Sequence, residues 1–162
     1  RNAVMVTETV AVPPPVSRFP IGLVAEILAT LGMDLIMRQL PEGQTPPAVA
    51  AGVLTKTHPD QSPDRLGTVA HYLAGTATGL LFVWLSLAVE SLAGEPSLLT
   101  AAGTGLVLYV LMVGFFILVP LPRVPELSAD RRRTTGRDWA IMAAGYLLVL
   151  VPVVTLGNQF VA

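Results

Sequence analysis

Residues 21–40 read IGLVAEILATLGMDLIMRQL, and this stretch decides the class of fold. A helix of about 20 apolar residues, rising about 1.5 Å per residue, spans the hydrocarbon core of a bilayer, which is about 30 Å thick. The stretch therefore predicts a membrane-spanning helix, although it carries Glu26, Asp34 and Arg38.

Polar and small residues recur at every fourth position of this stretch, at Gly22, Glu26, Thr30, Asp34 and Arg38. Positions four apart lie on the same side of an α-helix, so these residues form a polar stripe on an otherwise apolar helix. Because a charged side chain at mid-bilayer costs several kcal/mol, we expect the stripe to face protein or water rather than lipid.

The composition agrees with a membrane protein, since 52% of the 162 residues are hydrophobic and only 13% are charged, against about 25% charged in an average soluble protein. The net charge of −1 argues against a nucleic-acid binder, which would have a strong surplus of basic residues. The chain has no cysteine, which excludes disulfides, thiolate metal sites and a cysteine nucleophile.

Three further apolar segments follow, which predicts an all-α, four-helix transmembrane bundle. Pro20 suits the first turn of the first helix, and Pro41 stops that helix. We expect an exposed N-terminal arm at residues 1–19 and a single four-span domain at residues 20–162. The expected spans are residues 20–40, 68–92, 98–119 and 138–157.

The first and third connections between the spans are polar. In the first, Thr45 precedes Pro46 and Pro47, which is a helix-start signal and predicts a short interfacial helix over residues 48–55. The third connection, residues 123–137, is charged. Most basic residues lie in these two connections, and the second connection and the C-terminal tail have none. By the positive-inside rule, both termini lie outside a cell membrane.

The third connection contains five arginines, and four of them cluster near its end: Arg131, Arg132, Arg133 and Arg137. We interpret this cluster as a topology signal, and contact with anionic lipid is the alternative.

Asp34, Arg38 and His71 are expected at one depth, near the cytoplasmic ends of the first two spans. We predict an Asp34–His71 contact of hydrogen-bond length, about 3 Å, or one bridged by a single water. One interpretation is a proton relay or a ligand-binding group. The other is a structural hydrogen bond between helices, with Arg38 extending toward the lipid headgroups.

Glu26 lies nearer the outer face, where desolvation favours its neutral form. It is either a proton or cation site, or a neutral acid bonded to a neighbouring hydroxyl or carbonyl. With Thr30, Asp34, Arg38 and His71 it makes up the expected intramembrane polar cluster.

His71, Gly75 and Gly79 form the pattern H-x-x-x-G-x-x-x-G. Small residues four apart allow close approach of another helix, so we predict a packing face whose partner is the stripe that begins at Gly22. Haem is not indicated, because axial ligation usually needs histidine and the second one, His58, lies in a connection. No catalytic pattern or metal-spaced cluster is present, so we expect no enzyme activity, no metal and no cofactor.

Two strings carry a resemblance to known proteins, GLVAxxxATxxMD at residues 22–34 and AHYxxGxxxG at residues 70–79. In these strings the chain resembles small uncharacterised four-helix membrane proteins of prokaryotes. The resemblance covers residues 20–160 and implies an integral membrane location without any activity. A looser functional analogy is to small multidrug-resistance transporters, which also have four helices and a carboxylate in the first.

Two functions remain open at this point. The first is a non-catalytic accessory or structural subunit of a membrane complex, whose partners are the lipid bilayer and other subunits or further copies of the chain, with no nucleic acid. The alternative is a small proton-coupled transporter or channel that uses Glu26, Asp34 and His71. An intramembrane enzyme is the least favoured option.

Overall fold

The computed structural model describes residues 14–94 and 96–161, and in these ranges the chain is helical without any strand. The elements are α1 (Pro15–Met37), α2 (Thr45–Thr55), η1 (Pro59–Gln61), α3 (Asp64–Ala93), α4 (Leu98–Leu118), α5 (Pro120–Arg123) and α6 (Ala129–Val161). Among the described residues, α1, α3, α6 and the α4–α5 segment are long and apolar enough to cross a membrane. The expected all-α bundle of four apolar helices with a short helix in the first connection is therefore confirmed.

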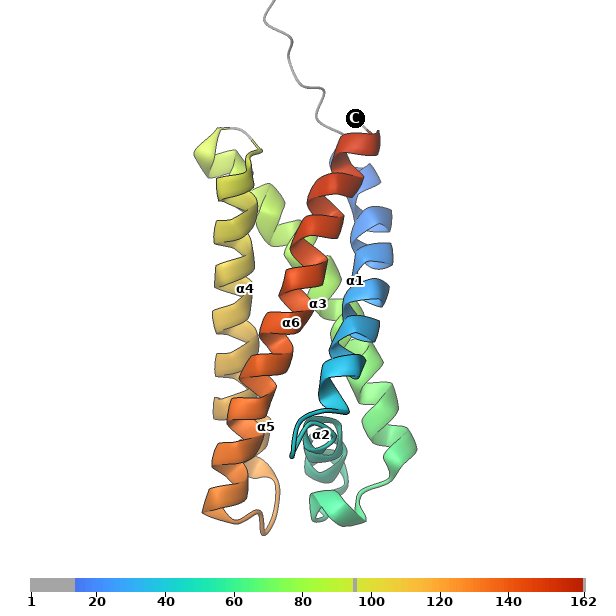
Figure 1. Cartoon of the computed structure of the whole chain (residues 1–162), viewed down its shortest axis with the longest axis vertical. Coiled ribbons are helices and arrows are strands. Elements are labelled where there is room, and N and C mark those ends of the chain that lie inside the picture. The colour runs from blue at the N-terminus through green and yellow to red at the C-terminus, as the bar shows by residue number, and fades with distance from the viewer. Residues whose placement is uncertain (1–13, 95, 162) are drawn as a thin grey trace, which may run out of the picture.

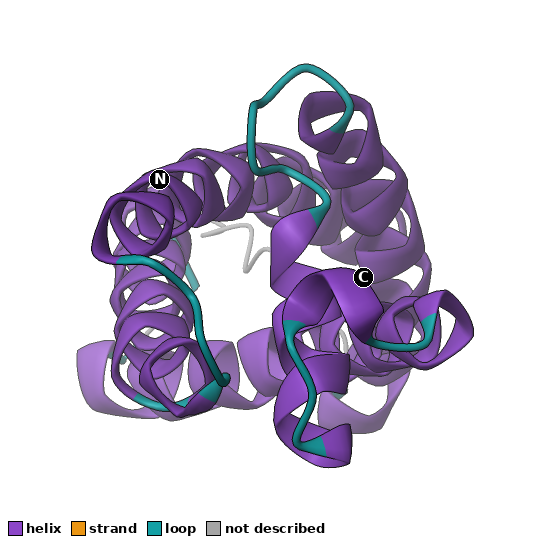
Figure 2. Ribbon diagram, turned by 90° about the horizontal axis from the view of Figure 1, so that it is seen from below, coloured by secondary structure: helices purple, strands orange, loops and turns teal. Residues whose placement is uncertain are grey.

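The four long helices run along the long axis of the molecule, and α2 lies across one end of the bundle, where it is seen end-on in Figure 1. Helix α1 packs against both α3 and α6, and α4 packs mainly against α6. The lower ends of α3 and α4 lie far apart in Figure 1, with α2 near the bottom of the bundle. The view from below shows the same helices joined by short loops (Figure 2).

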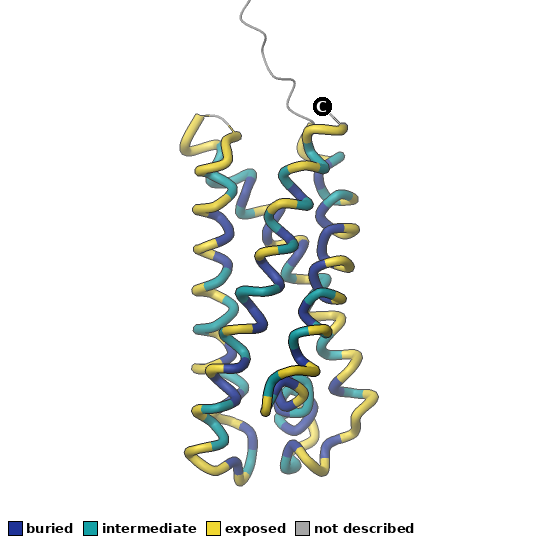
Figure 3. The backbone as a smooth tube through the Cα atoms, viewed as in Figure 1, coloured by how far each residue is buried: buried dark blue, intermediate teal, exposed yellow. Residues whose placement is uncertain are grey.

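The core lies where α1 meets α6. Ala25, Ala29, Met33 and Met37 of α1 recur every four residues and are buried, and they belong to one cluster with Tyr146 of α6. Small alanines at the first two positions let the helix backbones approach closely. The outer sides of the long helices are largely exposed (Figure 3), and they carry leucines such as Leu148. Such apolar outer surfaces suit a hydrocarbon environment.

The first helix begins earlier than the sequence predicted. Helix α1 starts at Pro15, so residues 15–19 are helical rather than part of an extended arm, although Pro15 and Val16 are exposed; residues 1–13 lie outside the described residues. Arg18 is only 3% exposed and forms an ion pair with Glu90 of α3 at 2.6 Å. This contact explains the extension, because the buried pair requires the segment before Pro20 to be ordered.

The last helix also begins earlier. Helix α6 starts at Ala129, so most of the expected charged connection at residues 123–137 is helical. The Ser128 hydroxyl accepts a hydrogen bond from the backbone N–H of Arg131 at 3.3 Å, which is an N-cap interaction. Arginine is a good helix former, and no proline interrupts this segment, so the helix extends beyond the apolar span.

Smaller differences occur at the first connection. Helix α1 ends at Met37 rather than near residue 40, because the chain tightens there into a turn in which the Gln39 N–H bonds to the Ile36 carbonyl. Helix α2 begins at Thr45 itself, with Gln44 as the N-cap residue. Its Val49 is fully buried, so α2 is part of the packed bundle end.

Candidate functional site

The polar stripe of α1 faces α3, as predicted. A Cβ added at Gly79 would overlap the Cβ of Glu26, and one added at Gly75 would lie 2.6 Å from the Thr30 hydroxyl. A Cβ at Gly22 would likewise overlap the side chain of Val83. These glycines therefore allow α1 and α3 to approach closely, and the predicted packing face is confirmed.

The predicted Asp34–His71 contact is present. His71 Nε2 lies 2.9 Å from Asp34 Oδ1, and the Tyr72 hydroxyl donates to Asp34 Oδ2 at 2.8 Å. Each carboxylate oxygen of Asp34 therefore has a hydrogen-bond partner on α3. Tyr72 was not among the predicted site residues, although its place directly after His71 is a signal that it lies nearby.

A polar recess of about 370 Å³ adjoins this pair, between the end of α1 and the starts of α2 and α3. Arg38 lines the recess together with Asp34, His71, Tyr72 and Asp64. The structure thus places Arg38 beside the predicted cluster, and no hydrogen bond from its side chain to Asp34 or His71 is present.

Glu26 is 3% exposed and is enclosed by hydroxyl groups. It accepts a hydrogen bond from Thr76 of α3 at 3.0 Å and a longer one from Thr30 at 3.4 Å. This is the hydroxyl partnership that the sequence offered as one of two alternatives. Thr76 follows Gly75 on the packing face, and only the crossing of the two helices brings it to Glu26.

The arginine cluster has a structural role that the sequence did not indicate. Arg131 donates to Glu42 at 2.9 and 3.0 Å and to Asp60 with two bonds of 2.8 Å. The hydrogen bond from Arg131 lowers the pKa of Asp60 below its usual value, and the charges of Arg131 and His58 act in the same direction. Arg131 therefore joins the first connection to α6 rather than extending freely toward lipid.

Asp138 also joins the first connection to α6. Its side chain is fully buried and accepts from the backbone N–H of Glu42 at 2.9 Å and from Arg137 at 2.8 and 3.0 Å. Arg132 donates to the Leu127 carbonyl at 3.0 Å, and Arg133 is exposed. Arg131 and Asp138 thus join the first connection to α6, whereas Arg132 and Arg137 bond to residues of their own segment. The topology role of the arginine cluster stays a prediction.

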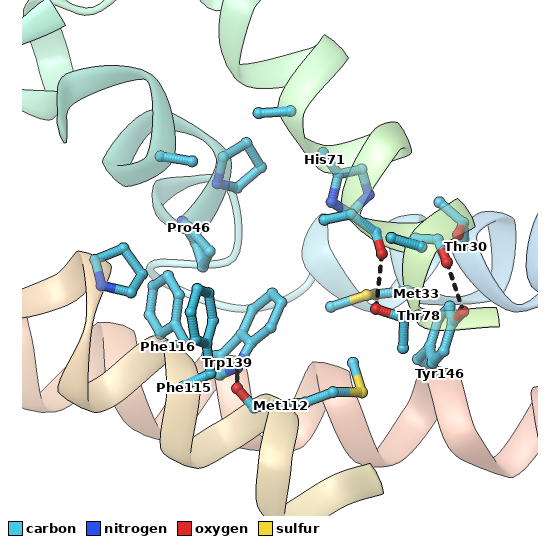
Figure 4. Close-up of a pocket in the computed structure, with 17 residues that line it drawn as sticks. Thr30, Met33, Pro46, His71, Thr78, Met112, Phe115, Phe116, Trp139 and Tyr146 are labelled. Atoms are coloured by element: carbon cyan, nitrogen blue, oxygen red, sulfur yellow. Dashed lines mark hydrogen bonds between the residues drawn. The ribbon is translucent and has the colours of Figure 1, made fainter. Parts of the chain in front are cut away.

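An apolar cavity of about 320 Å³ lies on the other side of His71, which lines both the cavity and the polar recess. Small residues of α3, such as Ala74 and Ala77, form one wall. Aromatic residues form the facing wall, where Phe116 and Trp139 stack with their ring centroids 4.7 Å apart. Figure 4 shows His71 across the cavity from this aromatic pair.

Within residues 14–94 and 96–161, no group of three or more His, Cys, Asp or Glu side chains is arranged to hold a metal ion. Comparisons of the chain with protein-family models, with curated proteins and with solved structures find no match.

Proposed function

We propose that this multi-pass membrane protein is a non-catalytic structural subunit of a membrane protein complex. One observation carries the proposal: the buried and half-buried Arg, Asp, Glu and His side chains of the long helices each have at least one partner within the chain. The groups with such partners are Arg18, Glu26, Asp34, Glu90 and Asp138. Hydrogen bonds between membrane helices hold the helices together, and groups engaged in this way need no substrate to satisfy them.

The outer face of α4 supports a partner subunit. A Cβ added at Gly103 or Gly114 would meet no atom of the described chain within 4 Å, whereas one at Gly105 would lie 2.9 Å from Val151 of α6. At 3.6 residues per turn, positions 103 and 114 lie on the same face of the helix. Small residues on one exposed face allow another helix to approach closely in a membrane.

Photo-cross-linking tests this function. The chain lacks cysteine, so a single cysteine at Gly103 or Gly114 can carry a photoactivatable maleimide in native membranes. We expect one discrete cross-linked product at both positions, and none from a matched cysteine at Leu148, which is 76% exposed on α6. Mass spectrometry then separates a second copy from a different subunit. If none of the three positions gives a cross-linked product, the proposal is contradicted.

The alternative, a proton-coupled carrier, is favoured by a specific feature of Asp34. Its side chain is 22% exposed and lines the polar recess, so water can reach the Asp34–His71 pair. If the pair is structural, Asp34→Asn should assemble normally and lose about 0.6 kcal/mol of stability, the average for polar contacts in membranes. Proton flux into proteoliposomes decides the matter: flux in the native protein that disappears in a folded Asp34→Asn variant would establish the carrier instead.

We also propose that both termini lie outside the cell membrane, on the support of the arginine-rich bundle end. In the cysteine-free chain, single cysteines at two exposed positions that flank α4 in sequence report the orientation: Ala93, the last residue of α3, and Ser128, directly before α6. We expect an impermeant maleimide to label Ala93→Cys in intact cells and Ser128→Cys only after lysis. The reverse pattern would invert the topology, and equal labelling would rule out an odd number of spans between the two positions.

A further inference from the structure

The apolar cavity is open at its side, between α3 and α4. Ala74 and Ala77 of α3 and Phe115 of α4 line it, and all three are exposed on the surface of the bundle. Ala74 and Ala77 lie within the apolar part of α3, about 15–20 Å along the helix from its start at Asp64 at about 1.5 Å per residue. The mouth therefore opens at the depth of lipid chains, so that a membrane lipid can enter sideways.

The cavity is small and mostly apolar. No Lys, Arg, Asp or Glu lines it. Its volume of about 320 Å³ is at the lower end of the range of small-molecule sites, about 300–1,000 Å³. A lipid with two bulky chains or a charged headgroup therefore fits poorly, because the space is limited and burial of an unpaired charge is costly. A single neutral chain fits the space.

The hydrogen-bond donors on the cavity wall are already used within the protein. Tyr146 donates to the Gly75 carbonyl at 3.1 Å, Thr78 to the Ala74 carbonyl at 2.7 Å, and Trp139 to the Met112 carbonyl at 3.1 Å. Each of these hydroxyl groups has one proton to give, so the oxygens of Tyr146 and Thr78 retain only lone pairs. These two oxygens can accept a hydrogen bond but cannot donate another.

His71 also lines the cavity. Its side chain is 10% exposed, and its Nε2 is hydrogen-bonded to Asp34 at 2.9 Å. No described residue bonds to Nδ1 of His71, and a ligand hydroxyl can partner this nitrogen in either role, because a hydroxyl both donates and accepts hydrogen bonds. The oxygens of Tyr146 and Thr78 thus require a ligand that donates a hydrogen bond, and a hydroxyl ligand also suits His71.

We propose that this cavity binds a neutral single-chain lipid alcohol, which places its hydroxyl against His71 and its chain between the small wall of α3 and the aromatic pair Phe116–Trp139. The hydroxyl donates to a wall acceptor, which a ketone or an alkane cannot do. The remainder of a longer chain leaves through the mouth between α3 and α4 into the bilayer.

Trp139 reports directly on the cavity. In the Trp84→Phe variant, whose replaced side chain is 63% exposed, Trp139 is the only tryptophan. We would titrate this protein, in phosphatidylcholine nanodiscs, with 6-bromohexan-1-ol, 7-bromoheptan-2-one and 1-bromohexane, since bromine quenches indole fluorescence. The reciprocal Trp139→Phe variant keeps only Trp84 and measures partition of each probe into the bilayer.

After correction for partition, we expect saturable quenching of Trp139, with the alcohol binding about two- to tenfold more tightly than the ketone or alkane, as one hydrogen bond allows. His71→Phe should reduce that preference, whereas Tyr72→Phe, which removes a bond to Asp34 outside the cavity, should not. Quenching without saturation, or equal affinity for the three probes, would overturn the proposal.

A blocking variant tests the mouth independently of His71. Ala77→Leu places bulk at the exposed rim, where it should leave folding intact and abolish saturable quenching by every probe. Ala102→Leu makes the same change on an exposed position of α4 that does not line the cavity, and it should have no effect. Full quenching in a folded Ala77→Leu protein would refute entry between α3 and α4.

Discussion

Replacing Gly79 with alanine will destabilise the protein by about 1–3 kcal/mol, the usual cost of overpacking a close contact. The added Cβ would overlap the Cβ of Glu26. Both atoms are attached to helix backbone, so neither can rotate away and α1 must shift from α3. That shift also lengthens the bond from Thr76 to Glu26, which is 3.0 Å in the native protein.

The matched control is Gly103→Ala, the same substitution on a helix of the same bundle. Nothing lies within 4 Å of the added atom there, and alanine is the better helix former by up to about 1 kcal/mol. Unfolding in mixed detergent micelles, followed by circular dichroism, should show that Gly79→Ala is less stable than the native protein and that Gly103→Ala is at least as stable. If Gly79→Ala unfolds like the native protein, α1 and α3 do not pack through these glycines.

Replacing Arg131 with glutamine will cost about 1.5–3 kcal/mol, the range for hydrogen bonds to charged groups. Most of this loss comes from Glu42, which is 19% exposed and loses its cation, because Asp60 is 58% exposed and is easily solvated. Arg133→Gln is the control, since Arg133 is exposed and makes no hydrogen bond within the described chain that the change would break; we expect an effect within about 0.5 kcal/mol.

The same variant has a defined pH dependence. Arg131 lowers the native pKa of Asp60 below its usual value of 3.8, so the ionised Asp60 stabilises the native state at neutral pH. This contribution is present above the unfolded pKa and is lost as the pH falls through the lowered native value. The stability difference between native protein and Arg131→Gln should therefore shrink on acidification, and a difference that stays constant down to pH 2 would show that Asp60 does not contribute.

Much of the bundle follows from local periodicity in the sequence. Four apolar segments predict four long helices, and residues four apart share a helix face whatever the helix packs against. The stripe of α1 and the glycines of α3 were therefore predictable as complementary faces. The Asp34–His71 contact, 2.9 Å in the structure, was also predictable, because two antiparallel spans bring residues near the same membrane surface to the same depth.

The tertiary structure alone decided which neighbours complete each site. The hydrogen bonds from Thr76 to Glu26 and from Tyr72 to Asp34 depend on how far each helix is rotated about its axis and on where the two helices cross. The residue pattern of a single helix specifies neither the rotation nor the crossing point. The pairs Arg18–Glu90 and Arg131–Glu42 join residues 72 and 89 positions apart in the chain. Arg18 was expected in the exposed arm, and Arg131 and Glu42 were expected in connections.

The cavity is another feature that only the tertiary structure decided. It exists because the lower ends of α3 and α4 diverge while α2 closes the end of the bundle (Figure 1). Periodicity determines which face of a helix is apolar, but it does not determine the angle between two helices. That angle results from the packing of all the side chains between the two helices. The angle between α3 and α4 creates the cavity beside His71 and Trp139.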